Sequence, residues 1–302
     1  MDRFEVTVGR FRAFVATYPG SKPEAGAGAH PEIPGSGWDP EWDSRLPATK
    51  DSLMSHLRIC SESSPEPPWL SDPVILLPGP HPPIRPTISS SSSSSSSGVP
   101  LILPDGGPSG PHAPLPPNSP WPDGNWPIMH PLDRFPTWPF QPGVDSESEG
   151  ENLPVNCVTW FEAFAFCAWD GGRLVTEAEW NYAVAAGSEQ REYPWGTSLP
   201  DKTLTDMPPC SSLFQKSCNN AAVSVGSRSP KSDGKWSHAD LGGSMDEWNL
   251  DGYQDPYTTP CNDCAAMTGA TTRVVRSGLP SSLRSSASPD TRSTYIGFRC
   301  AR

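Results

Sequence analysis

Serines crowd the stretch near the end of the chain, RVVRSGLPSSLRSSASPDTRSTYIGFR, which runs from Arg273 to Arg299 and holds no cysteine. A serine hydroxyl becomes a good nucleophile only when an adjacent base takes its proton, and histidine is the usual base. No histidine lies between His238 and the C-terminus. The stretch therefore carries many hydroxyl groups without a local residue to activate them, and we do not expect a serine nucleophile here.

Eight cysteines are the other reactive groups of the chain. Cys261 and Cys264 form a CNDC pair, and Cys210 and Cys218 lie upstream. Four thiolates could hold a zinc ion, but the seven residues between the two upstream cysteines are poor spacing for that metal. Disulfides are favoured over a zinc site.

An even number of cysteines at this density indicates disulfides and an oxidising compartment. Their connectivity cannot be read from sequence, and a pairing of Cys60 with Cys157 competes with purely local pairs. The opening MDRFEVTVGRFRAFV shows no signal peptide. We expect a secreted or cell-envelope protein whose export signal precedes this chain. The alternative is a cytosolic protein with reduced thiols.

Two capped helices follow one another between residues 158 and 187. In each, a threonine is followed three residues later by a glutamate: Thr159 by Glu162, and Thr176 by Glu179. This is the pattern of a capping box, in which each side chain accepts a hydrogen bond from the backbone of the other residue. A short Gly-Gly-Arg-Leu turn joins them, so the sequence predicts a stable helical pair.

Further elements are predicted on both sides of this pair. Thr7 precedes Phe11 and Phe14 at helical spacing, which indicates an N-capped helix. Residues 19–64 show turn signals rather than periodicity, and we expect loops there. Near the C-terminus, VVRS and YIGFRCA are the clearest strand candidates.

Composition limits the class of protein. The net charge of −12 argues against a nucleic-acid partner, because an acidic protein repels the phosphate backbone. No apolar run reaches the length of about 18 residues that a membrane-spanning helix needs. More than half of the 39 prolines, together with a polyserine run, fall between residues 65 and 150. Such a segment cannot build a core, and we predict a disordered insertion there.

Several motifs in order resemble one family. PVNCVTWFEAFAFCAWDGGRLVTEAEWNYAVAAG, EYPWG, DLGGSMDEWNLDGY, VVRSG and IGFRCAR are similar to landmarks of the sulfatase-modifying factors, the formylglycine-generating enzymes. The family writes these landmarks RLPTEAEWEYA, YPWG, GNVWEW, RGGSW and GFRCA. The opening DRFEVTVGRFRAFV resembles the family's EVTNxxYxxFV. The likeness covers about 18 residues at the start and about 165 at the end of the chain.

This resemblance implies a C-type-lectin-like α+β fold that is low in regular secondary structure. It also implies the copper- and oxygen-dependent oxidation of a sulfatase cysteine to formylglycine, although related members carry out other chemistry or only bind. In the oxidases, two cysteines after RGGS bind copper(I) as thiolates, for which serine is no substitute. The matching SGLPSSLRSS has no cysteine, so copper is not expected.

The resemblance also implies structural sites. Cys167 and Cys300 match a family pair that forms a disulfide. The spacing of CNDC, not the resemblance, makes Cys261 with Cys264 a second candidate pair. GGSMDEW matches the calcium-binding GNVWEW, so Glu247 would supply a carboxylate and Gly243 and Met245 backbone carbonyls. Two departures, Ser244 and Asp246, replace the usual asparagine and tryptophan. Calcium is therefore the one cofactor expected, at an altered site.

We predict a divergent member of this family in three parts: residues 1–64 as the N-terminal part of the domain with its usual start missing, residues 65–150 as the insertion, and residues 151–302 as the main domain. Its predicted role is a non-catalytic scaffold or binding module for a protein or a small ligand. The short loops from Ser277 to Arg292 would face the partner. No catalytic residue is predicted.

Three alternatives stay open. The chain could be a copper-dependent oxidase acting on sulfatase cysteines, with its nucleophile supplied by Cys261 and Cys264. It could be a receptor whose variable loop is the serine-rich tail. It could also be a truncated product without function, because several rigid motifs of the family are broken.

Overall fold

The computed structural model describes residues 1–58, 60, 137–138, 150–205, 222–257, 261, 263–277 and 279–302. The chain divides into two units, one made of Met1–Pro73 with His130–Arg302 and the other of Val74–Met129. The second unit lies outside the described residues, as does nearly all of the expected disordered insertion. The three segment boundaries therefore remain predictions.

One tryptophan of segment 65–150 is part of the packed core. Trp138 is 4% exposed and meets Phe11 edge to face, with ring centroids 6.4 Å apart. The guanidinium of Arg12 lies 5.0 Å from the centre of its ring. Next to it, the backbone N–H of Thr137 donates to Asn156 Oδ1 at 2.7 Å. This end of the segment thus packs with the first unit.

Helix α1 spans Val8–Thr17 and begins where the sequence predicts. The Thr7 side chain accepts a hydrogen bond from the backbone N–H of Arg10 at 3.3 Å, which satisfies a donor that the helix leaves free. Phe11 and Phe14 are fully buried. The predicted helix and its cap are confirmed.

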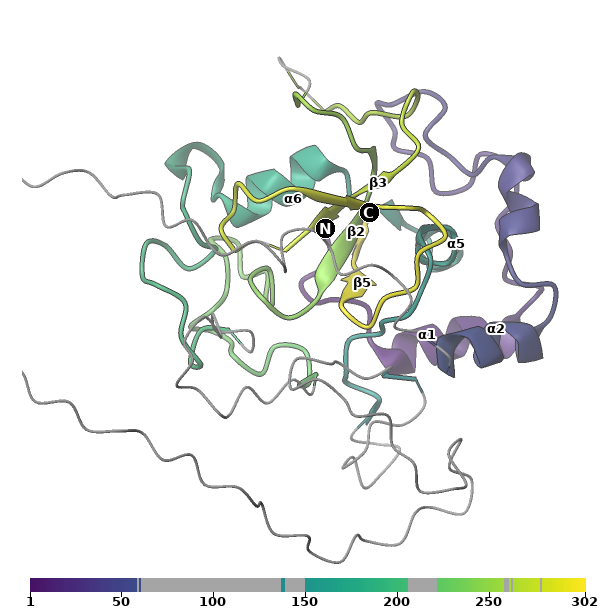
Figure 1. Cartoon of the computed structure of the whole chain (residues 1–302), viewed down its shortest axis with the longest axis horizontal. Coiled ribbons are helices and arrows are strands. Elements are labelled where there is room, and N and C mark those ends of the chain that lie inside the picture. The colour runs from purple at the N-terminus through teal and green to yellow at the C-terminus, as the bar shows by residue number, and fades with distance from the viewer. Residues whose placement is uncertain are drawn as a thin grey trace, which may run out of the picture. The chain divides into compact units, whose positions relative to one another are not determined.

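Two elements lie in the region 19–64 where only loops were expected. The 3-10 helix η1 covers Pro40–Arg45 and α2 covers Lys50–Arg58. Leu53 and Leu57, one turn apart on α2, are fully buried, and α2 lies beside α1 (Figure 1). The prediction of loops alone was wrong for this region. Two leucines at helical spacing are enough to hold a short helix such as α2 on a core.

Helix α5 spans Trp160–Trp169, and α6 spans Glu177–Val184. Both capping boxes are present, each with the threonine side chain and the glutamate side chain bonded to the other's backbone. α6 ends at Val184 with Ala185 as its C-cap, and a short 3-10 helix η2 then covers Gly187–Glu189. The predicted helical pair is confirmed.

Two sheets lie at the centre of the described part of the chain (Figure 1). The antiparallel pair β1 and β6 comprises Arg173–Leu174 and Cys300–Ala301. The larger sheet has the order β4-β3-β2-β5, with bounds Ser285–Ala287, Arg273–Arg276, Asp246–Gly252 and Ile296–Phe298. β2 and β5 run parallel, and the other neighbours run antiparallel. The strand predictions for VVRS and YIGFRCA are confirmed, whereas the central strand β2 was not predicted.

The start of the chain is held between two later segments. The backbone N–H of Val6 donates to Phe298 at 2.9 Å, and that of Val155 donates to Val6 at 2.9 Å. Nearer the terminus, Asp2 donates to Cys300 at 2.7 Å. Both ends of the chain therefore lie side by side in the same unit (Figure 1).

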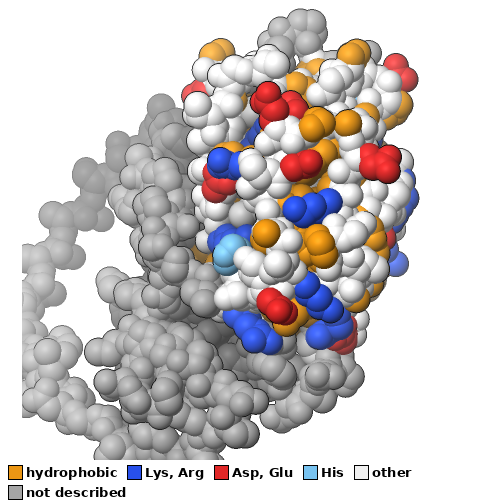
Figure 2. Space-filling view, turned by 90° about the vertical axis from the view of Figure 1, so that its right-hand side faces the viewer, with side chains coloured by type: hydrophobic (Ala, Val, Ile, Leu, Met, Phe, Trp, Pro, Cys, Tyr) orange, Lys and Arg blue, Asp and Glu red, His pale blue; other side chains and the backbone are white. Residues whose placement is uncertain are grey.

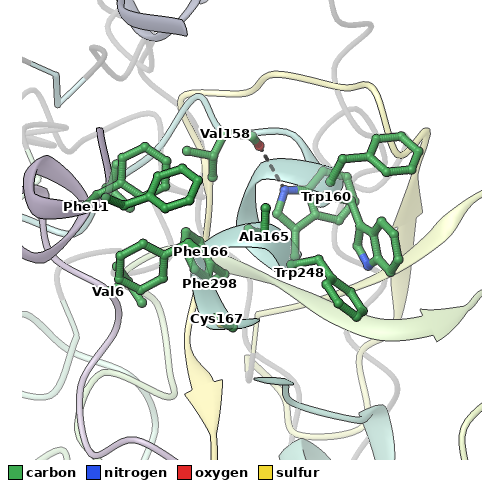
Figure 3. Packing of buried hydrophobic residues seen from close by; sticks show 14 of the residues in the cluster. Val6, Phe11, Val158, Trp160, Ala165, Phe166, Cys167, Trp248 and Phe298 are labelled. Carbon is green, nitrogen blue, oxygen red and sulfur yellow. Dashed lines mark hydrogen bonds between the residues drawn. The ribbon is translucent and has the colours of Figure 1, made fainter. Parts of the chain in front are cut away.

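An aromatic core fills the space between α1, α5 and the larger sheet. Phe11 stacks on Phe166 with ring centroids 5.4 Å apart, and Phe166 meets Phe298 at 5.5 Å (Figure 3). The indole N–H of Trp248 donates to the carbonyl of Val158 at 3.0 Å, so this buried donor has an acceptor (Figure 3). The core binds the first and last segments of the chain to α5.

The two faces of β2 differ in chemistry. Trp248 and Leu250 join the aromatic core, as alternate residues of a strand point to one face. Glu247 and Asp251, the residues on either side of this pair, bond to α6 through the indole of Trp180 and the backbone of Glu177 respectively. A layer of buried charge thus lies between β2 and α6, and it positions the site described next.

The described helices include none that is long and apolar enough to cross a membrane. On the face shown in Figure 2, positive and negative side chains alternate with apolar ones, and no broad field of one sign appears. This mixed surface gives no footprint for a polyanion.

Candidate functional site

Arginines fasten the serine-rich segment to the helices. Arg276 and Arg284 both bond to Glu177, the first residue of α6, at 2.8 Å and 2.6 Å. Arg292 bonds in the same way to Glu162 of α5, at 2.8 Å. The loops from Ser277 to Arg292 are therefore tied at three points. They are half-buried over most of their length, which leaves less free surface than the sequence suggested.

Ser281, a buried serine of this segment, is not arranged as a nucleophile. The hydroxyl of Ser281, which is buried, donates to the carbonyl of Arg191 at 2.6 Å. Its own carbonyl accepts from Arg276 at 2.5 Å. The Ser281 hydroxyl therefore donates its hydrogen bond to a carbonyl and not to a base that could raise its reactivity.

A cavity opens where this segment meets the end of β2. Its volume is about 60 Å³. The lining comes from α6, the end of β2 with its following loop, and the serine-rich segment: Glu177, Asp251, Gly252, Gln254, Tyr257, Cys264, Ala265, Ala266 and Arg284. Carboxylate, guanidinium, phenol and disulfide therefore share one hollow.

Asp251 is the perturbed acid of this cavity. Burial, with a smaller contribution from the nearby charge of Glu177, raises the pKa of its carboxyl from 3.8 to about 6. The backbone N–H groups of Glu177 and Ala266, which donate to its two oxygens at 2.7 Å and 3.1 Å, act in the opposite direction. Asp251 can therefore gain or lose a proton near neutral pH.

Arg284 is fixed on all sides. Its guanidinium carbon lies 4.9 Å from the ring centres of both Tyr253 and Tyr257. Two of its nitrogens donate to the carboxylate of Glu177 at 2.6 Å and 2.9 Å, and the third donates to the carbonyl of Gln254 at 2.9 Å. These hydrogen bonds to Glu177 raise the pKa of Arg284, so it presents a constant positive charge to the cavity.

All six cysteines among the described residues are paired. Disulfides join Cys167 to Cys300, Cys60 to Cys157, and Cys261 to Cys264. Cys167 and Cys300 are fully buried, where they tie α5 to β6. The upstream cysteines at positions 210 and 218 lie outside the described residues.

The predicted calcium residues are engaged with the protein itself. Glu247 is 1% exposed. Its two oxygens accept from Arg299 at 2.7 Å and 2.5 Å, and one also accepts from the indole of Trp180 at 3.0 Å. A carboxylate held by charge-assisted bonds at both oxygens has little capacity left for a cation. Glu247 is thus the partner of an arginine in this structure, and calcium at this loop stays a prediction.

The rest of the GGSM loop faces another carboxylate. The hydroxyl of Ser244 and the backbone N–H of Met245 donate to Glu5 at 2.9 Å each. Burial, followed by the charges of Asp240 and Glu247, raises the pKa of Glu5 well above its usual value. Glu5 thus keeps its proton to a higher pH than an exposed glutamate would.

Gly243, the third predicted calcium residue, has a conformational role. Its φ of +90° is one that side chains rarely adopt, and an added Cβ would collide with the Thr205 hydroxyl. Its backbone N–H donates to the carbonyl of Ser277 at 3.3 Å. Among the described residues, no group of three or more His, Cys, Asp or Glu side chains is arranged to hold a metal ion.

A copper(I) centre does not fit the described donors either. Copper(I) prefers thiolates, the described cysteines are bonded in pairs, and the segment Ser277–Arg292 contains none.

Sequence reasoning missed the charged layer around Glu177. Asp251, Arg276 and Arg284 are separated from Glu177 by 74, 99 and 107 positions. The signal that could have found part of it is the alternation of polar and apolar residues in DEWNLDG, which is typical of a strand with one polar face.

Comparison with known proteins places the chain in a family. The model of the sulfatase-modifying factor enzyme 1-like domain matches residues 1–302. The chain is 31% identical over 183 residues to the formylglycine-generating enzyme of Streptomyces coelicolor, covering 54% of this chain and 57% of that protein. It is also 31% identical over 183 residues to the inactive C-alpha-formylglycine-generating enzyme 2 of Bos taurus, covering 57% of each.

The chain therefore spans a little over half the length of these two relatives. Among solved structures, PvdO from Pseudomonas aeruginosa matches with a TM-score of 0.41 and 23% identity, over 50% of this chain and 62% of that one. This degree of structural overlap is too low to support an argument about the site. The match of the family model to the whole chain is decisive: the chain belongs to the sulfatase-modifying factor enzyme 1-like domain family.

Proposed function

We propose that the chain is a non-catalytic member of its family that serves as a binding module. One observation carries this proposal: the segment Ser277–Arg292 holds no thiol, and its two arginines form hydrogen bonds with Glu177 and Glu162. A segment with that chemistry stabilises the domain and offers no ligand for copper(I). Similarity to an inactive relative at the same identity as to an active one is compatible with this role.

The proposed scaffold is the C-type-lectin-like fold of the family. Its support is the mixture of short helices with two small sheets and the meeting of both chain ends at one core. The disulfides between distant residues favour an oxidising compartment such as the cell envelope or the secreted space. In this proposal the disulfides, rather than a bound metal, would hold the loops of the scaffold.

The cavity beside Asp251 is the proposed ligand site. It combines a small hollow of about 60 Å³ with a buried carboxyl group and a guanidinium that neighbouring groups hold in place. Few polar groups that converge in a concave site are typical of small-ligand binding. A small polar molecule is the ligand class that this lining suits.

The test of catalysis is peptide oxidation. A sulfatase-derived peptide with its target cysteine would be incubated with copper, oxygen, a thiol reductant and this protein, and the products read by mass spectrometry. The Streptomyces coelicolor relative serves as the positive control. We expect product with the control and none with this chain. Copper-dependent turnover by this chain would overturn the proposal and favour the oxidase alternative.

The test of binding is a thermal-shift screen of small polar molecules. Ala266→Leu places a larger side chain in the cavity, and Ala25→Leu makes the same change on an exposed loop. We expect a ligand that raises the melting temperature of the wild type and of Ala25→Leu but not of Ala266→Leu. A ligand whose effect survives in Ala266→Leu would place the site elsewhere.

A further inference from the structure

Two of the described disulfides differ sharply in their surroundings. Cys167 and Cys300 are completely buried and 133 positions apart in sequence. Cys261 and Cys264 are only three positions apart, both half-exposed, and Cys264 lines the cavity. A disulfide that closes so short a loop removes little entropy from the unfolded chain. Stabilisation of the fold therefore accounts for the Cys167–Cys300 bond much better than for the Cys261–Cys264 bond.

A hydroxyl group is directed at one sulfur of the short-range pair. The Tyr257 hydroxyl lies 3.3 Å from Cys261 Sγ and donates to it. Burial, followed by the charges of Glu177 and Asp251, raises the pKa of Tyr257. The phenol therefore keeps its proton at a pH where a thiol ionises, and a donor near sulfur stabilises the thiolate over the thiol.

Charge at the cavity is mixed. Arg284, which packs on Tyr257, brings a positive charge that favours thiolate. Asp251 in the same cavity and Asp263 between the cysteines bring negative charge that opposes it. The hydrogen bond from Tyr257 acts on one sulfur alone, so the two sulfurs are inequivalent: Cys261 has the donor, and Cys264 faces the cavity.

We propose that Cys261 and Cys264 form an exchangeable disulfide that reacts with low-molecular-weight thiols, with Cys264 as the sulfur attacked and Cys261 as the leaving thiolate. This goes beyond the binding role proposed above, because it assigns reversible redox chemistry to the cysteine pair beside the cavity.

The exchange balances in two steps. A thiolate attacks Sγ of Cys264, the bond between the two cysteines breaks, and its electron pair stays on Cys261, where the Tyr257 hydroxyl donates to it. A second thiolate then attacks the sulfur that the first thiol contributed, which releases that thiol pair as a disulfide. The Cys264 thiolate that remains takes a proton from water. Two thiols are oxidised and one protein disulfide is reduced.

The first experiment is differential alkylation of the folded, oxidised protein in glutathione buffers, with each cysteine read by peptide mapping. We expect Cys261 and Cys264 to be labelled at least about tenfold faster than Cys167 and Cys300, because exchange requires access to the attacked sulfur. Equal protection of the two pairs in the folded protein would overturn the proposal.

The second experiment tests the inequivalence of the sulfurs. In Cys264→Ser, the rate of alkylation of Cys261 is measured against pH. We expect an apparent pKa below the ordinary value of about 8.5 for a cysteine. Adding Tyr257→Phe should raise it and slow labelling at neutral pH by about three- to tenfold.

Tyr253→Phe is the matched control for this measurement. Tyr253 flanks Arg284 at the same 4.9 Å as Tyr257, but it is Tyr257 whose hydroxyl contacts Cys261. We expect Tyr253→Phe to leave the pH profile unchanged. Identical profiles for the two phenylalanine variants, or an ordinary pKa for Cys261, would overturn the assignment of Cys261 as the leaving thiolate.

Discussion

Arg299 and Glu247 form a two-pronged ion pair at the centre of the protein, with nitrogen-to-oxygen distances of 2.7 Å and 2.5 Å and at most 1% of either side chain exposed. Arg299 lies between β5 and β6, and Glu247 lies on β2. The arginine also donates to the carbonyls of Ala239 and Arg3. One side chain of the GFRC motif thus ties together the two sheets and the start of the chain.

We expect Arg299→Leu to destabilise the domain by about 3–5 kcal/mol, because it leaves Glu247 charged and buried without its partner. Equilibrium unfolding in urea measures this loss. Arg302→Leu is the matched control, since Arg302 is half-exposed and pairs with Asp2 and Asp170, and exposed ion pairs contribute about 0–1 kcal/mol. Similar losses for both variants would contradict the central role of Arg299.

The same ion pair predicts the response to calcium. Because the oxygens of Glu247 are taken by Arg299, we expect added calcium, compared with a chelator, to leave the melting temperature unchanged. Calcium binding to the native state would raise it through mass action. A calcium-dependent rise that Glu247→Gln abolishes would instead establish the site that the GGSMDEW motif suggested.

Local signals in the sequence were sufficient to predict part of the fold. Thr159 and Glu162 lie three residues apart, and their mutual hydrogen bonds depend on helix geometry alone. The same holds for Thr176 and Glu179. By contrast, β2 has four polar residues in seven and all seven are buried. Two of its carboxylates, Glu247 and Asp251, are tolerated because partners from distant elements satisfy them, and a single sequence does not show which partners these are.

At the candidate site, too, local features could be predicted from the sequence and long-range contacts could not. The lack of cysteine after VVRS could be seen directly in the sequence, but the use of Arg284 and Arg292 as ties to Glu177 and Glu162 could not. Those pairs join residues 107 and 130 positions apart. Glu162 was predicted correctly to lie in the first turn of its helix, and Glu177 directly follows the predicted cap Thr176, yet only the packed fold brings the arginines to them.

The disulfides should contribute unequally to stability. For the loop of Cys167–Cys300, which spans 133 positions, the entropy of loop closure corresponds to about 5 kcal/mol, against about 2 kcal/mol for the short loop of Cys261–Cys264. We expect Cys167→Ser with Cys300→Ser to lose much more stability in urea than Cys261→Ser with Cys264→Ser. Equal losses would mean that the short-range bond is structural, which would also weaken the case for its exchange with thiols.

Asp251 predicts how stability depends on pH. Its pKa is about 6 in the folded protein and 3.8 without the fold, so folding favours the protonated form. Its contribution is complete below about pH 3.8 and declines as the pH rises through 6, by about 3 kcal/mol in all. Glu5, whose pKa is also raised, adds a slope of the same sign.

Asp251→Asn should therefore flatten, but not abolish, the fall in unfolding free energy between pH 4 and pH 7, as measured by urea titrations at several pH values. Asp201→Asn is the control: its hydrogen bonds with Thr203 lower the pKa of Asp201, so that group stays ionised over this range. If both variants keep the full slope of the wild type, the acid that titrates on folding is not Asp251, and the cavity would lack the proton-exchanging group that its burial implies.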